Sequence, residues 1–73
     1  MELDINKAAG MILSAAERGE GGPFMPYAVA YAKHLPTSSE TELPDQILYT
    51  LNNLGGWRGE QARMVKSYLK SLL

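Results

Sequence analysis

The chain contains 73 residues, of which 45% are hydrophobic and 21% are charged, a balance typical of an ordinary globular domain. Because domains commonly run from about 50 to about 200 residues, we expect a single helical domain that spans residues 1–73. The absence of cysteine excludes disulfide bonds and thiolate metal sites, and a single histidine excludes a multi-histidine metal site. We therefore expect no metal and no cofactor, and the net charge of −1 indicates no particular class of partner.

The N-terminal residues and the length of the apolar runs predict a cytoplasmic protein. No apolar run approaches the roughly 20 residues that a bilayer-spanning helix needs. Glu2 and Asp4 stand where a secretory signal would carry a basic region. We expect no association with membranes.

The first predicted helix covers Ile5 to Arg18. Asp4 is a candidate N-cap, because its carboxylate can accept hydrogen bonds from the free N–H groups of the first turn. Gly19 follows the last periodic residue and suits the left-handed position after a helix, where a Cβ would be disfavoured. Apolar residues recur at spacings of four, three and four and therefore share one face: Ile5, Ala9, Ile12 and Ala16.

The second predicted helix covers Pro26 to Leu35, with an alternative start at Pro23, because proline is tolerated in the first helical turn. This segment is apolar almost all round, which is typical of a helix buried on more than one side. Pro36 prevents the helix from continuing. We interpret His34 as a polar residue in the last turn, where the helix dipole favours a cation.

Residues 37–43 are polar and acidic, and we predict that they form a loop. A third helix is predicted from Pro44 to Leu54 and a fourth from Arg58 to Leu72, separated by a Gly-Gly-Trp turn at 55–57. The sequence therefore predicts an all-α fold of four short helices that form two packed helical hairpins.

No pattern of residues indicates catalysis. The acidic residues fall almost entirely at helix ends or in loops, where capping and solubility explain them. The glycine pairs at 21–22 and 55–56 lack the preceding strand and the lysine of a phosphate-binding loop. We therefore expect no catalytic residue and no enzymatic activity.

Trp57 lies in the most distinctive local stretch, residues 54–60, and two interpretations of it are open. A lone tryptophan between two helices can fold back over the preceding helix and cover the core. Alternatively, it can anchor a partner protein, because tryptophan, tyrosine and arginine are enriched at interface hot spots. Gly59 is unexpected in a first helical turn, and close approach of another backbone is one physical reason for it.

The charge is distributed unevenly along the chain. Residues 1–57 carry seven acids and three bases, whereas residues 58–73 carry four bases and one acid. The last helix therefore presents the basic cluster of this chain, and we choose as candidate contacts with a partner protein Trp57, Arg58, Arg63 and Lys66.

A short helix, a three-residue turn and a basic helix are also similar in outline to a helix-turn-helix. The alternative function is therefore a small DNA-binding protein. In that arrangement Arg58, Gln61 and Arg63 would face base edges, and Lys66 and Lys70 would face phosphates. The slightly acidic total charge disfavours this alternative, because nucleic-acid-binding proteins usually show a broader basic surface.

The number of large apolar side chains is high for so small a domain, which buries only about 60% of the surface of its unfolded chain. Phe24, Tyr27 and Tyr31 form a candidate surface for self-association into a homodimer, because such surfaces are rich in aromatic residues. The alternative is that a compact bundle of four helices buries most of them.

The stretch from Asp45-Gln46-Ile47 through Trp57-Arg58-Gly59 to Lys66 resembles small helical proteins encoded in phage and prophage genomes. This resemblance covers the C-terminal half and implies a binding protein directed at a host or its defences. The sequence therefore predicts a small stand-alone protein–protein interaction module, an accessory or inhibitor protein that acts by covering a surface of another protein.

Overall fold

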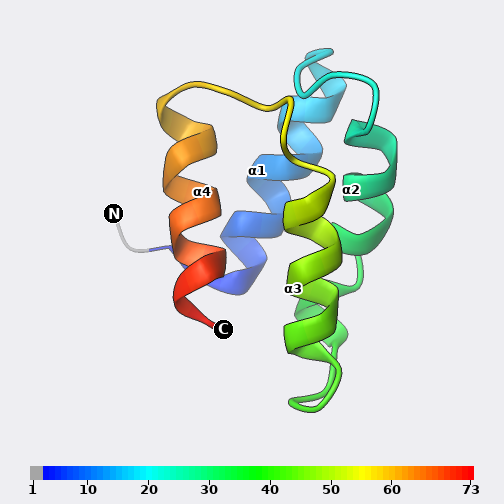
Figure 1. The fold of residues 1–73 in the computed structure, drawn as a ribbon, viewed down its shortest axis with the longest axis vertical. Helices are drawn as coiled ribbons and strands as arrows, with labels where there is room; N and C mark the ends of the chain where they lie inside the picture. Colours follow the sequence, from blue (N-terminus) through cyan, green and yellow to red (C-terminus); the bar gives the residue numbers. More distant parts are fainter. Residues whose placement is uncertain (1–2) are drawn as a thin grey trace.

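The computed structural model describes residues 3–73. Glu2, on which the predicted localisation partly depends, lies outside the described residues. Four α-helices and one short 3₁₀ helix follow one another along the chain: α1 (Ile5–Glu17), α2 (Met25–Ala32), η1 (Leu35–Thr37), α3 (Leu43–Asn52) and α4 (Glu60–Ser71). Consecutive α-helices run in opposite directions, so that α1 and α2 form one hairpin and α3 and α4 form the other (Figure 1). The predicted all-α class is confirmed, and residues 3–73 contain no strand.

The predicted start of the first helix and the two predicted capping residues are confirmed. The Asp4 carboxylate accepts a hydrogen bond of 2.8 Å from the Lys7 backbone N–H and therefore caps α1. Gly19 has a φ of 78°, the left-handed conformation that ends many helices and that glycine adopts without a steric penalty. The helix ends at Glu17, one residue before the predicted end.

The second helix is shorter than predicted, because it ends at Ala32 and a 3₁₀ turn follows. Pro36 lacks the N–H that would bond to the Ala32 carbonyl, and its ring disfavours an α conformation at the preceding residue. The hydroxyls of Thr37 and Ser38 donate to the His34 carbonyl at 3.3 and 2.7 Å, which satisfies one acceptor at this helix end.

The fourth helix begins later than predicted, at Glu60. Gly59 precedes it with a φ of 110°, a conformation that strongly favours glycine, and its carbonyl accepts the first backbone hydrogen bond of α4, from Arg63. Since α3 ends at Asn52, the connection between the helices spans residues 53–59 instead of three residues.

The two helix-connecting loops at one end of the bundle touch through their glycines. Gly21 and Gly56 form an isolated antiparallel bridge. A Cβ at Gly56 would lie 2.7 Å from the Gly21 carbonyl oxygen, so a side chain there would collide with backbone. Gly21 itself has a φ of 99°. The glycine pairs therefore serve a long-range contact between the hairpins as well as two local reversals of the chain.

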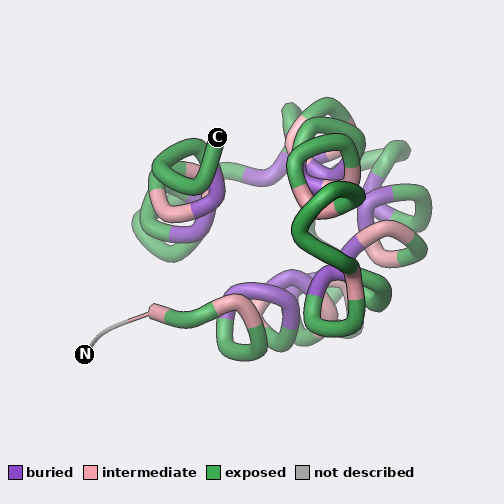
Figure 2. The backbone as a smooth tube through the Cα atoms, turned by 90° about the horizontal axis from the view of Figure 1, so that it is seen from below, coloured by how far each residue is buried: buried purple, intermediate pink, exposed green. Residues whose placement is uncertain are grey.

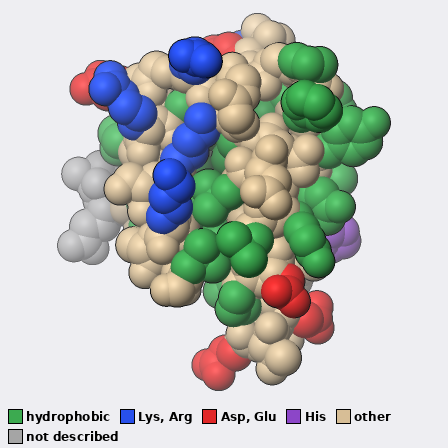
Figure 3. Space-filling view, viewed as in Figure 1, with side chains coloured by type: hydrophobic (Ala, Val, Ile, Leu, Met, Phe, Trp, Pro, Cys, Tyr) green, Lys and Arg blue, Asp and Glu red, His purple; other side chains and the backbone are tan. Residues whose placement is uncertain are grey.

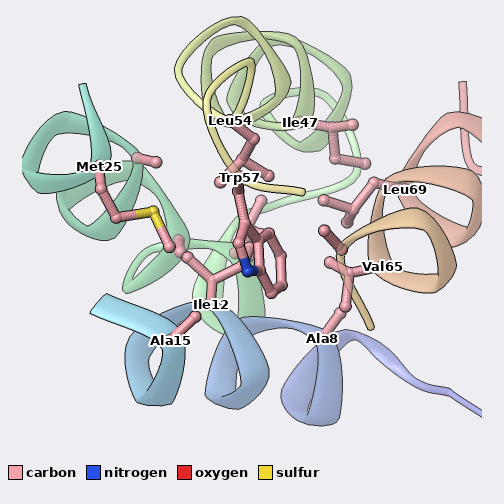
Figure 4. Packing of buried hydrophobic residues seen from close by; sticks show 13 residues of the cluster. Ala8, Ile12, Ala15, Met25, Ile47, Leu54, Trp57, Val65 and Leu69 are labelled. Carbon is pink, nitrogen blue, oxygen red and sulfur yellow. The ribbon is translucent and has the colours of Figure 1, made fainter. Parts of the chain in front are cut away.

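One hydrophobic core joins all the helices. Figure 2 shows buried positions along the inward sides of the helices. In Figure 4 the indole of Trp57 points from the α3–α4 loop toward α1. Its ring is the largest fully buried side chain among the described residues. The buried cluster consists of Ala8, Ile12, Ala15, Met25, Ala28, Ala32, Leu35, Ile47, Leu54, Trp57, Ala62, Val65 and Leu69.

None of the helices in residues 3–73 is long and apolar enough to cross a bilayer.

Candidate functional site

The loop that leads into α4 is held in place by Trp57, whose side chain is only 1% exposed. Its indole N–H donates a hydrogen bond of 3.2 Å to the Glu20 carboxylate, which satisfies the polar atom of an otherwise apolar ring. The core-covering interpretation is therefore confirmed. The prediction that Trp57 contacts a partner is wrong for its side chain, because no face of the ring is available.

Glu20 connects this loop to two other parts of the molecule. It accepts a hydrogen bond of 2.7 Å from Arg18, and Arg18 in turn donates to the Gln61 side chain at 3.2 Å, in the first turn of α4. Hydrogen bonds first from Arg18 and then from Trp57 hold the pKa of Glu20 below its ordinary value. Four polar and aromatic side chains thus tie the α1–α2 loop to the start of α4.

A pocket of about 450 Å³ opens beside this loop. Three cationic side chains line it, together with the loop that carries Trp57. Figure 3 shows lysine and arginine side chains gathered over α4 and its leading loop on one face of the molecule. We call this region the basic pocket, and its lining residues are Gly55, Trp57, Arg58, Gly59, Arg63 and Lys66. The structure therefore brings together the predicted contact residues Arg58, Arg63 and Lys66.

Lys66 is the most constrained cation of the basic pocket. Its ammonium group donates a hydrogen bond of 2.6 Å to the Trp57 carbonyl and is partly buried. Burial lowers the pKa of Lys66, and repulsion from Arg58 and Lys70 lowers it further. A backbone acceptor and the wall of the pocket therefore fix the position of this positive charge.

The cations of α4 and of the loop before it form no ion pair with an acid among residues 3–73. The ion pair that the structure contains within residues 3–73 joins Arg18 to Glu20. Arg58, Arg63 and Lys70 are exposed and have no carboxylate within ion-pair distance in that part of the chain. The positive charge of this face is therefore available to an external anion.

The N-terminus of α4 adds a fixed partial positive charge beside the basic pocket. Gly59 occupies the N-cap position and offers no side-chain acceptor to the free N–H groups of the first turn. A helix N-terminus carries roughly half a positive elementary charge. Sequence analysis missed this feature, although a glycine directly before an acidic helix start was a usable signal for it.

The helix-turn-helix comparison does not fit the geometry. The connection between α3 and α4 has seven residues and is built around a buried tryptophan. Gln61, which would face base edges in that arrangement, is bound to Arg18. Glu60 places a carboxylate in the first turn of α4, where a recognition helix reads DNA.

The predicted self-association residues share one side of the second helix and the turn before it. Phe24 is 59% exposed and Tyr27 is 61% exposed. Tyr31 is partly buried, because its ring packs against Tyr49 of α3 at a centroid distance of 5.3 Å. Apolar side chains also gather over α2 and α3 in Figure 3. Tyr49 extends this aromatic face onto α3, and the sequence analysis did not include it.

The described residues contain no group of three or more histidine, cysteine, aspartate or glutamate side chains that could hold a metal ion. No family model, no curated protein and no solved structure matches this chain.

Proposed function

We propose that this chain is a small stand-alone protein–protein interaction module, an accessory or inhibitor protein that works by covering a surface of its partner. The observation that carries this proposal is the basic pocket, where Arg58, Arg63 and Lys66 converge and no acid of the described chain neutralises them. Like charges held together raise the free energy of the unbound protein, and a partner that supplies negative charge relieves that cost.

The supporting wall of the basic pocket is also suited to recognition. The loop behind it is fixed by the burial of Trp57 and by the bridge between Gly21 and Gly56. A rigid surface loses little conformational entropy when it binds, which favours affinity. Arginine is enriched in protein interfaces, whereas lysine and acids are depleted there. A phage-derived protein directed at a host component is the biological setting that we propose for this module.

A charge reversal tests this proposal. We expect Arg63→Glu to weaken binding of a captured partner by at least about tenfold, because a cation of the pocket becomes an anion. Lys33→Glu is the matched control, since Lys33 is exposed directly after α2 and does not line the pocket. Lys66 is unsuitable for reversal, because its ammonium group holds the Trp57 carbonyl.

The partner is captured from a host lysate with the tagged protein, purified, and titrated calorimetrically against the three proteins. Equal affinity of the wild type and Arg63→Glu would exclude the basic pocket as the contact surface. A comparable loss in Lys33→Glu would show a non-specific charge effect.

We also propose that the exposed aromatic side chains Phe24 and Tyr27 form a self-association surface, together with the edge of Tyr31. Contiguous exposed apolar surface on a small soluble domain is typical of an interaction site. The large exposures of Phe24 and Tyr27 specifically favour this second role.

A further inference from the structure

We propose that the basic pocket binds the carboxylates of an acidic peptide segment. This inference rests on the proposed function and adds the chemistry of the partner. It follows from the volume of the pocket, from the three cations that line it and from the limited extent of the basic surface.

The shape of the basic pocket suits a peptide. Its volume of about 450 Å³ exceeds what one carboxylate needs and falls within the range of about 300–1,000 Å³ common for ligand sites. Gly55 and Gly59 lie on its wall, and nothing stands within 4 Å of the position that a Cβ would take at either residue. The absence of side chains at these two positions allows the backbone of an extended segment to approach the loop.

The arrangement of the cations suits several carboxylates. Arg58 lies in the loop, Arg63 lies one turn into α4, and both residues line the pocket. Each guanidinium can form paired parallel hydrogen bonds with one carboxylate. The ammonium of Lys66 uses one N–H for the Trp57 carbonyl and retains two. A segment with at least two neighbouring acids can pair with more of these hydrogen-bond donors than a single anion can.

Electrostatic linkage gives this site a spectroscopic signature. The pKa of Lys66 is lowered by burial and by its cationic neighbours Arg58 and Lys70. A carboxylate placed between these cations favours the charged ammonium, so binding raises the pKa of Lys66 again. A ligand that binds elsewhere leaves it unchanged.

The limited extent of the basic surface favours a short peptide over a nucleic acid. Glu60 lies in the first turn of α4, and Glu20 contacts the loop through Trp57. A duplex presents phosphates over a much longer surface than the pocket covers and would reach these carboxylates, whereas a short peptide can stay within the lining of the pocket, which contains no acid. The whole chain carries a net charge of −1, which gives no extended basic surface for such a contact.

The test titrates the intact protein with defined probes at one ionic strength. The probes are an acetylated, amidated peptide of eight glutamates, its eight-glutamine counterpart, inorganic phosphate and a 20-base-pair duplex DNA. Two-dimensional NMR follows the backbone amides and the titration of the Lys66 ammonium. We expect the glutamate peptide to bind, to shift the amides of residues 55–66 and to raise the pKa of Lys66. We expect the glutamine peptide to leave the spectrum unchanged.

Matched variants complete the test. Arg58→Gln together with Arg63→Gln is expected to weaken binding of the glutamate peptide by at least about tenfold. Lys33→Gln is expected to change it by less than about twofold. Neither arginine makes a hydrogen bond to another side chain in residues 3–73, so we expect the double variant to keep the wild-type spectrum outside the pocket.

Three outcomes would overturn the inference: equal binding of the glutamine peptide, tighter binding of the duplex, or equal affinity of inorganic phosphate and the glutamate peptide. If the glutamate peptide fails to bind while Arg63→Glu still weakens binding of the captured partner, the acidic-peptide inference is wrong and the interaction module stands. If both experiments are negative, both proposals fail.

Discussion

Two aromatic regions of this molecule differ in their burial. Trp57 lies in a loop that also holds three glycines and an arginine, and it is the largest fully buried side chain described. Phe24 and Tyr27 belong to a segment that is apolar almost throughout, and more than half of each side chain is exposed. The hydrophobicity of a segment therefore did not decide its burial; its position relative to the other helices did.

The geometry of the fold explains this contrast. The contact between Gly21 and Gly56 draws the α3–α4 loop across the end of the first hairpin, and the next residue points into the core. In α2 the burial is confined to Met25, Ala28 and Ala32, which share one side of the helix. Phe24 and Tyr27 lie away from this side and face outward, whereas Tyr31 is partly covered by Tyr49 of α3.

The largest effect is expected from Trp57→Ala. Removal of this buried ring and of its hydrogen bond to Glu20 is expected to lower the free energy of unfolding by about 3–5 kcal/mol. A domain of this length is stabilised by only about 4–11 kcal/mol in total. Urea denaturation followed by circular dichroism measures both values.

Phe24→Ala is the matched control, with an expected change within about 0.5 kcal/mol, because the side chain is exposed. Equal losses in the two variants would remove the distinction between the two aromatic regions.

A smaller effect is expected from Gly56→Ala, since its Cβ would lie 2.7 Å from the Gly21 carbonyl oxygen. The two loops must move apart to make room for the added Cβ, and we expect this to lower the free energy of unfolding by about 1–3 kcal/mol. Gly55→Ala is the control: nothing lies within 4 Å of its Cβ position and its φ is not positive, so we expect a change within about 0.5 kcal/mol. The midpoints of thermal unfolding of the two variants measure this difference. An unchanged midpoint in Gly56→Ala would show that the bridge between Gly21 and Gly56 does not hold the loop over the core.

A pH-dependent effect is expected at Glu20. Its pKa is lowered in the folded protein by hydrogen bonds from Arg18 and Trp57, so the folded state favours the ionised form. The resulting stabilisation is fully present above about pH 4.5, the ordinary value, and is lost as the pH falls through the lowered pKa.

Urea midpoints between pH 7 and pH 3, compared with those of Glu20→Gln, isolate this contribution. The difference between the two proteins should shrink steadily on acidification. A constant difference over that range would mean that Glu20 does not titrate with folding.

The smallest effect on stability is expected from Phe24→Ser combined with Tyr27→Ser, within about 0.5 kcal/mol for each exposed residue. The effect on assembly should be large, because both side chains belong to the proposed self-association surface. Light scattering after gel filtration should report a dimer for the wild type and a monomer for the double variant. Met64→Ser, which removes an exposed apolar side chain from α4, should leave the dimer intact. A monomeric wild type at high concentration would refute self-association.

Local chemistry determined much of the fold in advance. The Asp4 cap, the left-handed Gly19 and the four helical segments could be inferred from adjacent residues, because capping and backbone preferences act over one or two turns. The errors are also local in origin: Pro36 shortened α2, and the positive φ of Gly59 moved the start of α4 beyond Arg58.

The candidate site depends on contacts that the sequence could not specify. Residues 58–73 carry an excess of positive charge that is visible in the sequence. Only the tertiary structure brought Trp57 into contact with Glu20, which lies 37 residues away in the sequence, and buried the indole ring. It also placed the Lys66 ammonium group within hydrogen-bond distance of the Trp57 carbonyl. The physical reason is range: helix formation follows from neighbouring residues, whereas the burial of a side chain depends on which distant segments the folded chain places beside it.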